Sequence, residues 1–105
     1  MAYEGNGWSA LAEPTRRAIF ERLVEQPGSV TEIAAGLPVS RPAVSQHLKV
    51  LKDAGLVIDT QAGKQRVYRI DPAGLAAFRA ELDLFWSRTL TGFQAVVEGR
   101  EEKPE

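Results

Sequence analysis

Cysteine is absent from this 105-residue sequence, and histidine occurs only once. Without cysteine the chain can form neither a disulfide nor a thiolate metal site, which is compatible with a reducing compartment. A chelating pair of histidines within one chain is excluded too, because His47 is alone. A site shared between two chains by carboxylates and His47 stays open, but the sequence shows no ligand cluster for it. We therefore expect no metal ion.

Long apolar runs are also absent. No stretch reaches the ~18 consecutive apolar residues that suggest a transmembrane helix. The N-terminal "MAYEGNGW" has neither the basic start nor the apolar core of a secretory signal peptide. Apolar residues make up 44% of the chain and charged residues 26%, a balance that allows one small packed core. We expect a single cytoplasmic domain over residues 1–105, without a membrane partner.

The motifs of common enzymes are missing as well. The chain has no Gly-rich phosphate loop, no cysteine nucleophile and no histidine outside residues 41–53. Its scattered carboxylates are explained most simply as solvated charges or helix-start charges. We expect no catalytic activity and no cofactor.

Charge is nearly balanced over the whole chain but unevenly distributed along it. The formal net charge is -1. Residues 41–69 contain six basic and two acidic residues, a local charge of +4, whereas residues 1–40 and 70–105 carry -2 and -3. A basic middle between acidic ends concentrates attraction for an anion on one surface, which favours a nucleic-acid partner. Solvated lysines on ordinary helices are the alternative explanation.

Residues 29–57, "SVTEIAAGLPVSRPAVSQHLKVLKDAGLV", have the pattern of two helices joined by a short turn. Ser29 and Glu32 have the spacing of a capping box, and Gly36 suits a left-handed end to the first helix. The second helix is expected to stop at Gly55. Together they predict a helix-turn-helix over about 29–55, whose second helix can lie in a major groove of DNA. The stripe that faces the core is predicted to be Val44, Leu48 and Leu51.

Helices and one hairpin account for the rest of the chain. Residues 7–28 have the pattern of a short helix and a longer one, with Pro14 in the first turn of the second. Val, Ile, Thr and Tyr are concentrated in residues 56–60 and 65–70, which predicts two strands joined by a turn. A long helix follows them. The expected fold is mainly α with a small β-hairpin wing at about 56–70, in the order α-α-α-α-β-β-α. The longer of the first two helices is expected to bury Ile19, Phe20, Leu23 and Val24.

The face of the second helix opposite its apolar stripe is polar and basic, which suits contact with DNA. A helix fits the major groove, which is ~12 Å wide, and reads base edges with its N-terminal residues. Arg41 can bond guanine O6 and N7, Gln46 can pair with adenine, and Ser45 can bond a base or a phosphate. Other polar groups of this face, Lys52 among them, and two cations of the hairpin are expected near phosphates or the minor groove. The predicted DNA-contacting residues are Ser40, Arg41, Pro42, Ser45, Gln46, His47, Lys49, Lys64 and Arg66.

The last helix carries more aromatic residues than a small core can cover, and Trp8 adds to the excess. The helix could fold back on its own domain. We favour a symmetric homodimer, because aromatic residues are enriched in interfaces and twofold closure is the commonest assembly. Such a dimer presents two recognition helices ~34 Å apart, one turn of DNA, and predicts an inverted-repeat target. The predicted interface residues are Trp8, Leu11, Phe85, Trp86 and Phe93.

Three segments resemble the ArsR/SmtB family of bacterial winged helix-turn-helix repressors: "ALAEPTRRAIFERL", "TEIAAGLPVSRPAVSQHLKVLKDAGLV" and "GKQRVYRID". They occur in the family's order and spacing, and the resemblance spans residues 8 to 97. It implies a homodimeric, cytoplasmic repressor of transcription that leaves DNA when an effector binds. The positions that it places at bases or phosphates are Arg41, Ser45, Gln46 and His47, with wing contacts near Lys64 and Arg66.

Two departures from the family argue against metal sensing. Metal-sensing members carry a cysteine motif in the short helix before the turn, where this chain has "SVTEIAAGL". Others use histidine and acidic ligands on the last helix, where "FRAELDLFWSRTLTGF" contains no histidine. The segment "LDLFWSRTLTGF" resembles a branch of the family that does not respond to metals.

Two other functions stay open at the level of sequence. A winged helix can bind another protein through the same helix or wing, although such a module need not be basic over residues 41–69. A DNA-binding repressor could also hold a small-molecule effector at the dimer interface, although ordinary interface packing is the simpler explanation. Activation of transcription is the alternative to repression, since the fold serves both. The residues that would line the effector pocket are Trp8, Phe85, Trp86 and Phe93.

Overall fold

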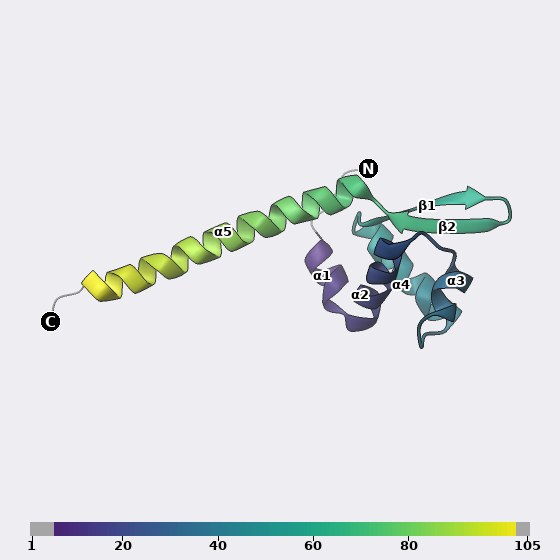
Figure 1. Cartoon of the computed structure of the whole chain (residues 1–105), viewed down its shortest axis with the longest axis horizontal. Helices are drawn as coiled ribbons and strands as arrows, with labels where there is room; N and C mark the ends of the chain where they lie inside the picture. Colours follow the sequence, from purple (N-terminus) through teal and green to yellow (C-terminus); the bar gives the residue numbers. More distant parts are fainter. Residues whose placement is uncertain (1–5, 103–105) are drawn as a thin grey trace.

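The computed structural model describes residues 6–102, which form five helices and one two-stranded sheet (Figure 1). Four helices come first, the hairpin follows, and the longest helix is last, so the predicted order is confirmed. The elements are α1 (Gly7–Ala12), α2 (Pro14–Glu25), α3 (Val30–Ala35), α4 (Arg41–Asp53), β1 (Val57–Ala62), β2 (Gln65–Ile70) and α5 (Pro72–Glu102).

One hydrophobic core is shared by the first four helices and the start of the hairpin. The predicted stripe of α4, which consists of Val44, Leu48 and Leu51, is 0% exposed. Burial of each such side chain stabilises the fold by about 1.5–3 kcal/mol. On α2 the prediction is only partly right, because Val24 is 61% exposed. It lies one residue, about 100° of helical turn, past Leu23, beyond the edge of the face that the other helices cover. The predicted residues that α2 does bury are Ile19, Phe20 and Leu23.

Side-chain caps define the starts of both helices of the helix-turn-helix. The Ser29 hydroxyl accepts from the Glu32 amide at 3.2 Å, and the Glu32 carboxylate accepts from the Ser29 amide at 2.9 Å, which confirms the capping box. Ser40 caps α4 by accepting from the Ala43 amide. The prediction of a left-handed Gly36 is wrong, since its φ is -100°. Its amide instead donates to the carbonyl three residues back, which tightens the last turn of α3 without a left-handed residue.

The end of α4 does use a left-handed glycine. Gly55 has a φ of 83°, which glycine adopts without a Cβ clash. Its amide donates to the Lys52 carbonyl at 2.9 Å, and the Leu56 amide donates to the Leu51 carbonyl at 3.0 Å. This pair of bonds is the Schellman motif, which reverses the chain at the end of a helix. The predicted stop at Gly55 is therefore confirmed, and the chain passes directly into β1.

The hairpin is regular and tied to the body near its base. Its register runs from Val57 opposite Ile70 to Ala62 opposite Gln65, so β1 is two residues longer at its tip than the predicted strand. Farther along β2, Tyr68 and Gly28 exchange two backbone hydrogen bonds of 2.9 and 3.0 Å, which attach the hairpin to the segment before α3. The hairpin thus stands beside the helix-turn-helix as a wing.

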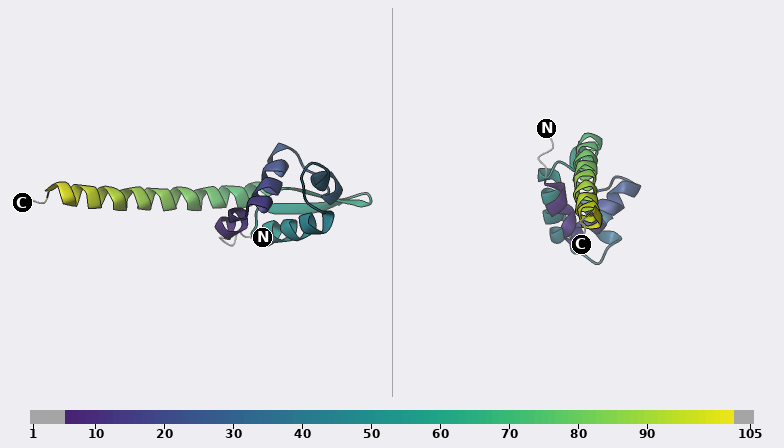
Figure 2. Two further views of the ribbon diagram at one scale, coloured as in Figure 1. Left: turned by 90° about the horizontal axis from the view of Figure 1, so that it is seen from below. Right: turned by 90° about the vertical axis from the view of Figure 1, so that its left-hand side faces the viewer.

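The last helix projects from the body instead of folding back over it (Figures 1 and 2). The structure measures 72 × 29 × 20 Å with a radius of gyration of 18.7 Å. A compact chain of this length has a radius of gyration of about 13 Å. Only the start of α5 packs on the core, through Leu75 and Phe78. None of the helices within residues 6–102 combines the length and the apolarity that a bilayer crossing requires.

Gly74 lets α5 begin directly against the end of α4. It is buried, and a Cβ placed on it would overlap the carbonyl oxygen of Gly55. That oxygen belongs to the backbone of the Schellman turn, so it cannot move aside as the tip of a flexible side chain could. Gly92, in the same helix, has open space where its Cβ would lie.

Gly74→Ala is therefore expected to destabilise the protein by about 1–3 kcal/mol, the usual cost of overpacking. Gly92→Ala, the same change in the same helix, should be neutral or stabilising by up to about 1 kcal/mol, because alanine favours the helix. Urea unfolding of both variants measures the two effects. Equal effects would contradict the close approach of Gly74 and Gly55.

Candidate nucleic-acid interface

The recognition helix α4 holds a polar face at a fixed orientation. Because its apolar stripe is fully buried, the helix cannot rotate without exposing core residues to water. The side chains opposite the stripe and at the helix start are therefore fixed relative to the rest of the fold. The predicted residues that are exposed on α4 or at its cap are Ser40, Arg41, Pro42, Ser45, Gln46 and Lys49.

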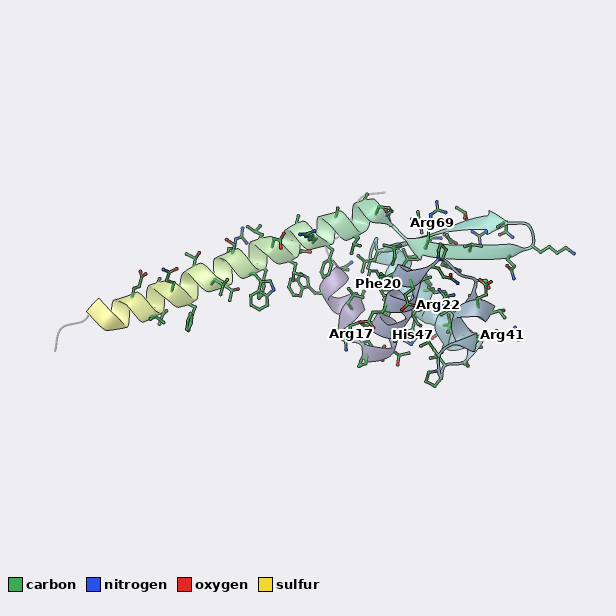
Figure 3. All side chains as sticks on the ribbon, in the orientation of Figure 1. Arg17, Phe20, Arg22, Arg41, His47 and Arg69 are labelled. Atoms are coloured by element: carbon green, nitrogen blue, oxygen red, sulfur yellow. The ribbon has the colours of Figure 1, made fainter. Side chains whose placement is uncertain are left out.

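Arg41 stands at the first position of α4. It lies on the side of the body formed by α3 and α4, away from α5 (Figure 3). Its Nη1 is 3.5 Å from the Thr31 hydroxyl on α3, at the outer limit of a hydrogen bond. Within the described residues its other donors have no partner, so a bidentate acceptor such as a guanine edge or a phosphate can still be bound.

His47 differs from the other predicted contacts, because it is half-buried beside α2 (Figure 3). Its Nδ1 lies 3.5 Å from Nη1 of Arg16. Arg16 also donates to the Ala10 carbonyl at 2.6 Å and to the Ser9 carbonyl at 3.3 Å, both in α1. This distance is at the outer limit of a hydrogen bond, in which the arginine can only be the donor. His47 therefore connects α4 with the first two helices.

One carboxylate that the sequence reasoning missed organises the basic residues near the hairpin. Oδ1 of Asp59 is 2.9 Å from Nζ of Lys52 on α4, and its Oδ2 is 3.0 Å from Nη1 of Arg66 on β2. We call these three residues the Asp59 bridge. The Asp59 side chain is only 9% exposed, whereas both cations are about half exposed. The strand alternation was a usable signal, since a two-residue turn at 63–64 places Asp59 and Arg66 on one face of the hairpin.

The bridge changes the acidity of its carboxyl group. The Lys52 ammonium donates to Asp59 and holds the pKa of that carboxyl below its usual range. Burial raises the pKa and opposes this effect, and Arg66 lowers the pKa further. Asp59 is thus a carboxylate at neutral pH, and it balances part of the local positive charge.

Lys49 also has an acidic partner, but in a different setting. Its Nζ is 3.2 Å from Oδ2 of Asp53, one helical turn later, and both side chains are well exposed. An exposed pair of this kind contributes little to stability and is readily exchanged for a phosphate. Lys64, at the tip of the hairpin, has no ion pair within the described residues.

Two grooves border the hairpin. The groove toward α4 has a volume of about 280 Å³, and both carboxylates, Asp53 and Asp59, line it together with Ser45 and Lys49. The groove toward α3 has a volume of about 220 Å³, and its lining includes the two predicted wing cations, Lys64 and Arg66. The structure therefore brings the wing cations close to the helix-turn-helix, as a single DNA-contacting surface requires.

The predicted interface residues lie at the other end of the molecule. Trp8 of α1 packs edge-on against Phe78 and Phe85 of α5, with ring centroids 5.7 and 5.1 Å apart, and Phe85 packs in the same way against Trp86. Trp86 is 52% exposed and Phe93, farther along α5, is 67% exposed. Leu11 is partly buried against the core. A groove of about 490 Å³ is lined by Trp8 and Phe85 but not by Trp86 or Phe93, so only two of the four residues predicted to line an effector pocket meet there.

Metal-ligating side chains are not gathered in the part of the chain that the structure describes. Among residues 6–102 no three histidine, aspartate or glutamate side chains lie close enough together to hold one ion.

Comparison with known proteins identifies the family. A profile described as "Helix-turn-helix domain" matches residues 11–60. The HTH-type transcriptional regulator Rv2034 of Mycobacterium tuberculosis is 62% identical over 91 residues, which cover 87% of this chain and 85% of that protein. The transcriptional repressor SmtB of the same species is 45% identical over 67 residues, 64% of this chain and 50% of the repressor. The chain belongs to the ArsR/SmtB family.

A solved ArsR-family structure supports the assignment of the elements. The homodimeric winged helix-turn-helix DNA-binding domain Mb0332 from Mycobacterium bovis is 30% identical, and the match covers 78% of this chain and 76% of that one with a TM-score of 0.60. In this ArsR/SmtB member, the helix-turn-helix predicted over about 29–55 corresponds to α3 and α4, and the predicted wing corresponds to β1 and β2. The predicted fold class and the function of a transcriptional regulator with a winged helix-turn-helix DNA-binding domain are confirmed.

In this ArsR/SmtB protein, Asp59→Asn is expected to lower the free energy of unfolding at neutral pH by about 1 kcal/mol, since the cations of the bridge are half exposed. The pKa of Asp59 in the folded protein lies below its unfolded value of ~3.9. The carboxylate therefore stabilises the fold above the unfolded pKa, and this stabilisation is lost as the pH falls through the folded-state pKa. Urea unfolding from pH 7 to pH 3 should show the two proteins converging below about pH 4.

Asp53→Asn is the matched control for this titration. It removes the same charge from an exposed pair, so its effect should stay within about 0.5 kcal/mol at every pH. If the Asp59 variant had the same loss of unfolding free energy at pH 3 as at pH 7, the stabilisation would not come from the carboxylate.

Proposed function

We propose that this regulator is a cytoplasmic homodimeric repressor, which binds an inverted-repeat operator and acts by occluding a promoter. The observation that carries the proposal is the fixed polar face of α4 beside a basic wing. The apolar stripe of α4 is buried, while Arg41, Ser45 and Gln46 are exposed near its N-terminal end. A helix in the major groove reads bases with residues in these positions. Repression agrees with the relative SmtB of M. tuberculosis, which is a transcriptional repressor.

Each contact in the proposal has a physical role. Arg41 reads a guanine with two parallel hydrogen bonds, Gln46 reads an adenine, and Ser45 bonds a base edge or a phosphate. The remaining contacts position the helix on the backbone and specify no sequence. His47 fits such a role through Nε2, since Nδ1 faces Arg16. The proposed positioning contacts are Ser40, Pro42, His47, Lys49, Lys64 and Arg66.

The exposed aromatic surface of α1 and α5 supports the homodimer. α5 projects from the body, so Trp86 and Phe93 remain more than half exposed, and Phe85 remains 45% exposed although Trp8 packs against it. A twofold-related copy would bury the same surface on both chains. The M. bovis domain is homodimeric, which supports a homodimer for this chain. Two copies related in this way present their α4 helices ~34 Å apart, one turn of DNA. The proposed interface consists of Trp8, Leu11, Phe85, Trp86 and Phe93.

An apolar effector has one candidate place in this proposal. The groove of about 490 Å³ beside Trp8 and Phe85 is within the size range of small-molecule sites. Because it adjoins the proposed interface, a ligand there could alter the spacing of the two α4 helices. Quenching of Trp8 and Trp86 fluorescence by an apolar compound would identify such a ligand.

Selection of binding sites from random duplex DNA at ~100 mM salt tests the function, since exposed charges still act over ~10 Å there. We expect enrichment of an inverted repeat with half-sites about one helical turn apart. Arg41→Ala should weaken binding to the selected site by about 1–3 kcal/mol and relax the preference at one base pair of each half-site. Lys64→Ala should weaken binding to all DNA sequences by the same factor.

The two variants check each other in this experiment. Both remove one exposed cation, so they differ in the role of the side chain and not in charge. If Arg41→Ala lost the same affinity for the selected duplex as for a scrambled duplex, Arg41 would not read a base. Absence of any enriched sequence with the wild-type protein would favour a protein-interaction module instead.

The dimer is tested by placing a charge in the proposed interface. Phe93→Glu should weaken self-association by about 2–4 kcal/mol, because two phenylalanine side chains lose their burial. Val24→Glu is the control, since Val24 is similarly exposed but lies on α2. Sedimentation equilibrium measures both variants. If Phe93→Glu remained as dimeric as Val24→Glu, the interface would lie elsewhere.

A further inference from the structure

The Asp59 bridge joins two parts of the surface that the proposed function places on DNA. Lys52 is in the last turn of α4, Arg66 is near the tip of β2, and each binds a different oxygen of one carboxylate. No other ion pair among the described residues connects the recognition helix with the wing. The carboxylate thus spans the groove between them, which has a volume of about 280 Å³.

The position of Asp59 is unfavourable for DNA binding if only its own charge is considered. It lines a groove that also contains Ser45 and Lys49, two of the proposed DNA contacts. A carboxylate here repels an approaching phosphate. It also competes with phosphates for two cations, because Lys52 and Arg66 lie 2.9 and 3.0 Å from its oxygens. A residue of this kind lowers affinity for DNA of any sequence.

The same contacts restrict the geometry of the wing. The hairpin is a two-stranded sheet, which on its own is only marginally rigid. Backbone bonds attach β2 to the segment before α3 at Gly28 and Tyr68, and Asp59 lies on β1 directly opposite Tyr68. The Asp59 bridge adds a side-chain link between the hairpin and α4. It therefore fixes the spacing between wing and recognition helix before DNA is bound.

We propose that Asp59 is a positioning residue that raises sequence selectivity. By holding Lys52 and Arg66, it sets the distance between α4 and the wing, and it restrains two cations that would otherwise bind any phosphate backbone. This inference rests on the proposed function, since it requires α4 and the wing to contact DNA. It assigns to an acidic residue a role in choosing the operator.

The consequence can be expressed through salt dependence. Each phosphate neutralised by a cation contributes about -0.9 to the slope of log K against log salt concentration. Removal of the Asp59 charge frees two cations in each protomer. Binding to scrambled DNA should then become tighter and more salt-dependent. The affinity for the selected operator should increase less, because a less restrained wing matches the operator less well.

The experiment compares Asp59→Asn with Asp53→Asn in the full chain, on the selected operator and on a scrambled duplex of equal length. Both variants remove one negative charge from the same groove, but Asp53 pairs only with Lys49 on its own helix. For Asp59→Asn we expect scrambled DNA to bind about 3–10-fold more tightly, with a slope steeper by about 1–2 per protomer. The ratio of operator to scrambled affinity should fall at least about fivefold, against less than about twofold for Asp53→Asn.

Asp59→Glu provides the rescue, because a glutamate retains the charge and can still reach both cations. It should restore most of the selectivity and the wild-type salt slope. Equal changes in selectivity and slope for Asp59→Asn and Asp53→Asn would overturn the inference, since the effect would then be charge alone. Unfolding curves recorded with the binding data exclude a folding defect as the cause.

The inference and the proposed function fail in different ways. If the wild-type protein did not distinguish its selected operator from scrambled DNA, the proposed function itself would be wrong. If the wild type discriminated and Asp59→Asn discriminated equally well, only the role of Asp59 would be wrong.

Discussion

Burial of one apolar stripe on α4 is the constraint on which the rest of the structure depends. Val44, Leu48 and Leu51 have no contact with solvent, and together they contribute on the order of 5–9 kcal/mol of hydrophobic stabilisation. This is comparable with the whole stability of a small domain. The helix therefore has one accessible orientation about its axis. Its polar face is therefore presented to a partner without a rotation of the helix at the moment of binding.

Charges in this protein are distributed unevenly along the chain. A net charge of -1 conceals a basic region between acidic ends, and the basic region itself contains a carboxylate, Asp59, whose side chain is only 9% exposed. The Asp59 bridge illustrates how a DNA-binding surface balances two requirements. Free cations increase affinity for every duplex, whereas restrained cations favour the duplex whose backbone matches their spacing. Because the Asp59 side chain is only 9% exposed, its ion pairs with Lys52 and Arg66 are screened less by salt than the exposed pair of Lys49 and Asp53.

The two ends of the molecule are connected through aromatic packing and polar side-chain contacts. Trp8 fixes α1 against α5 by edge-on aromatic packing. The carbonyls of α1 accept from Arg16, whose guanidinium also reaches His47 on α4. The surface proposed for dimerisation and the helix proposed for DNA reading therefore share a continuous set of contacts. Coupling between assembly and DNA binding would require a set of contacts of this kind.

The sequence by itself determined the element order, the capping box of α3, the stop at Gly55 and the apolar stripe of α4, because periodicity, caps and glycine stops act over a few residues. It also indicated which polar side chains would be exposed on α4. The exposed Val24 and the right-handed Gly36 could not be predicted, since each depends on what neighbouring elements cover or how the last turn closes. Only the tertiary structure showed the Asp59 bridge and the contact of His47 with Arg16. Those interactions join residues 7 to 31 positions apart, and which partners meet is decided by how the helices and the hairpin pack.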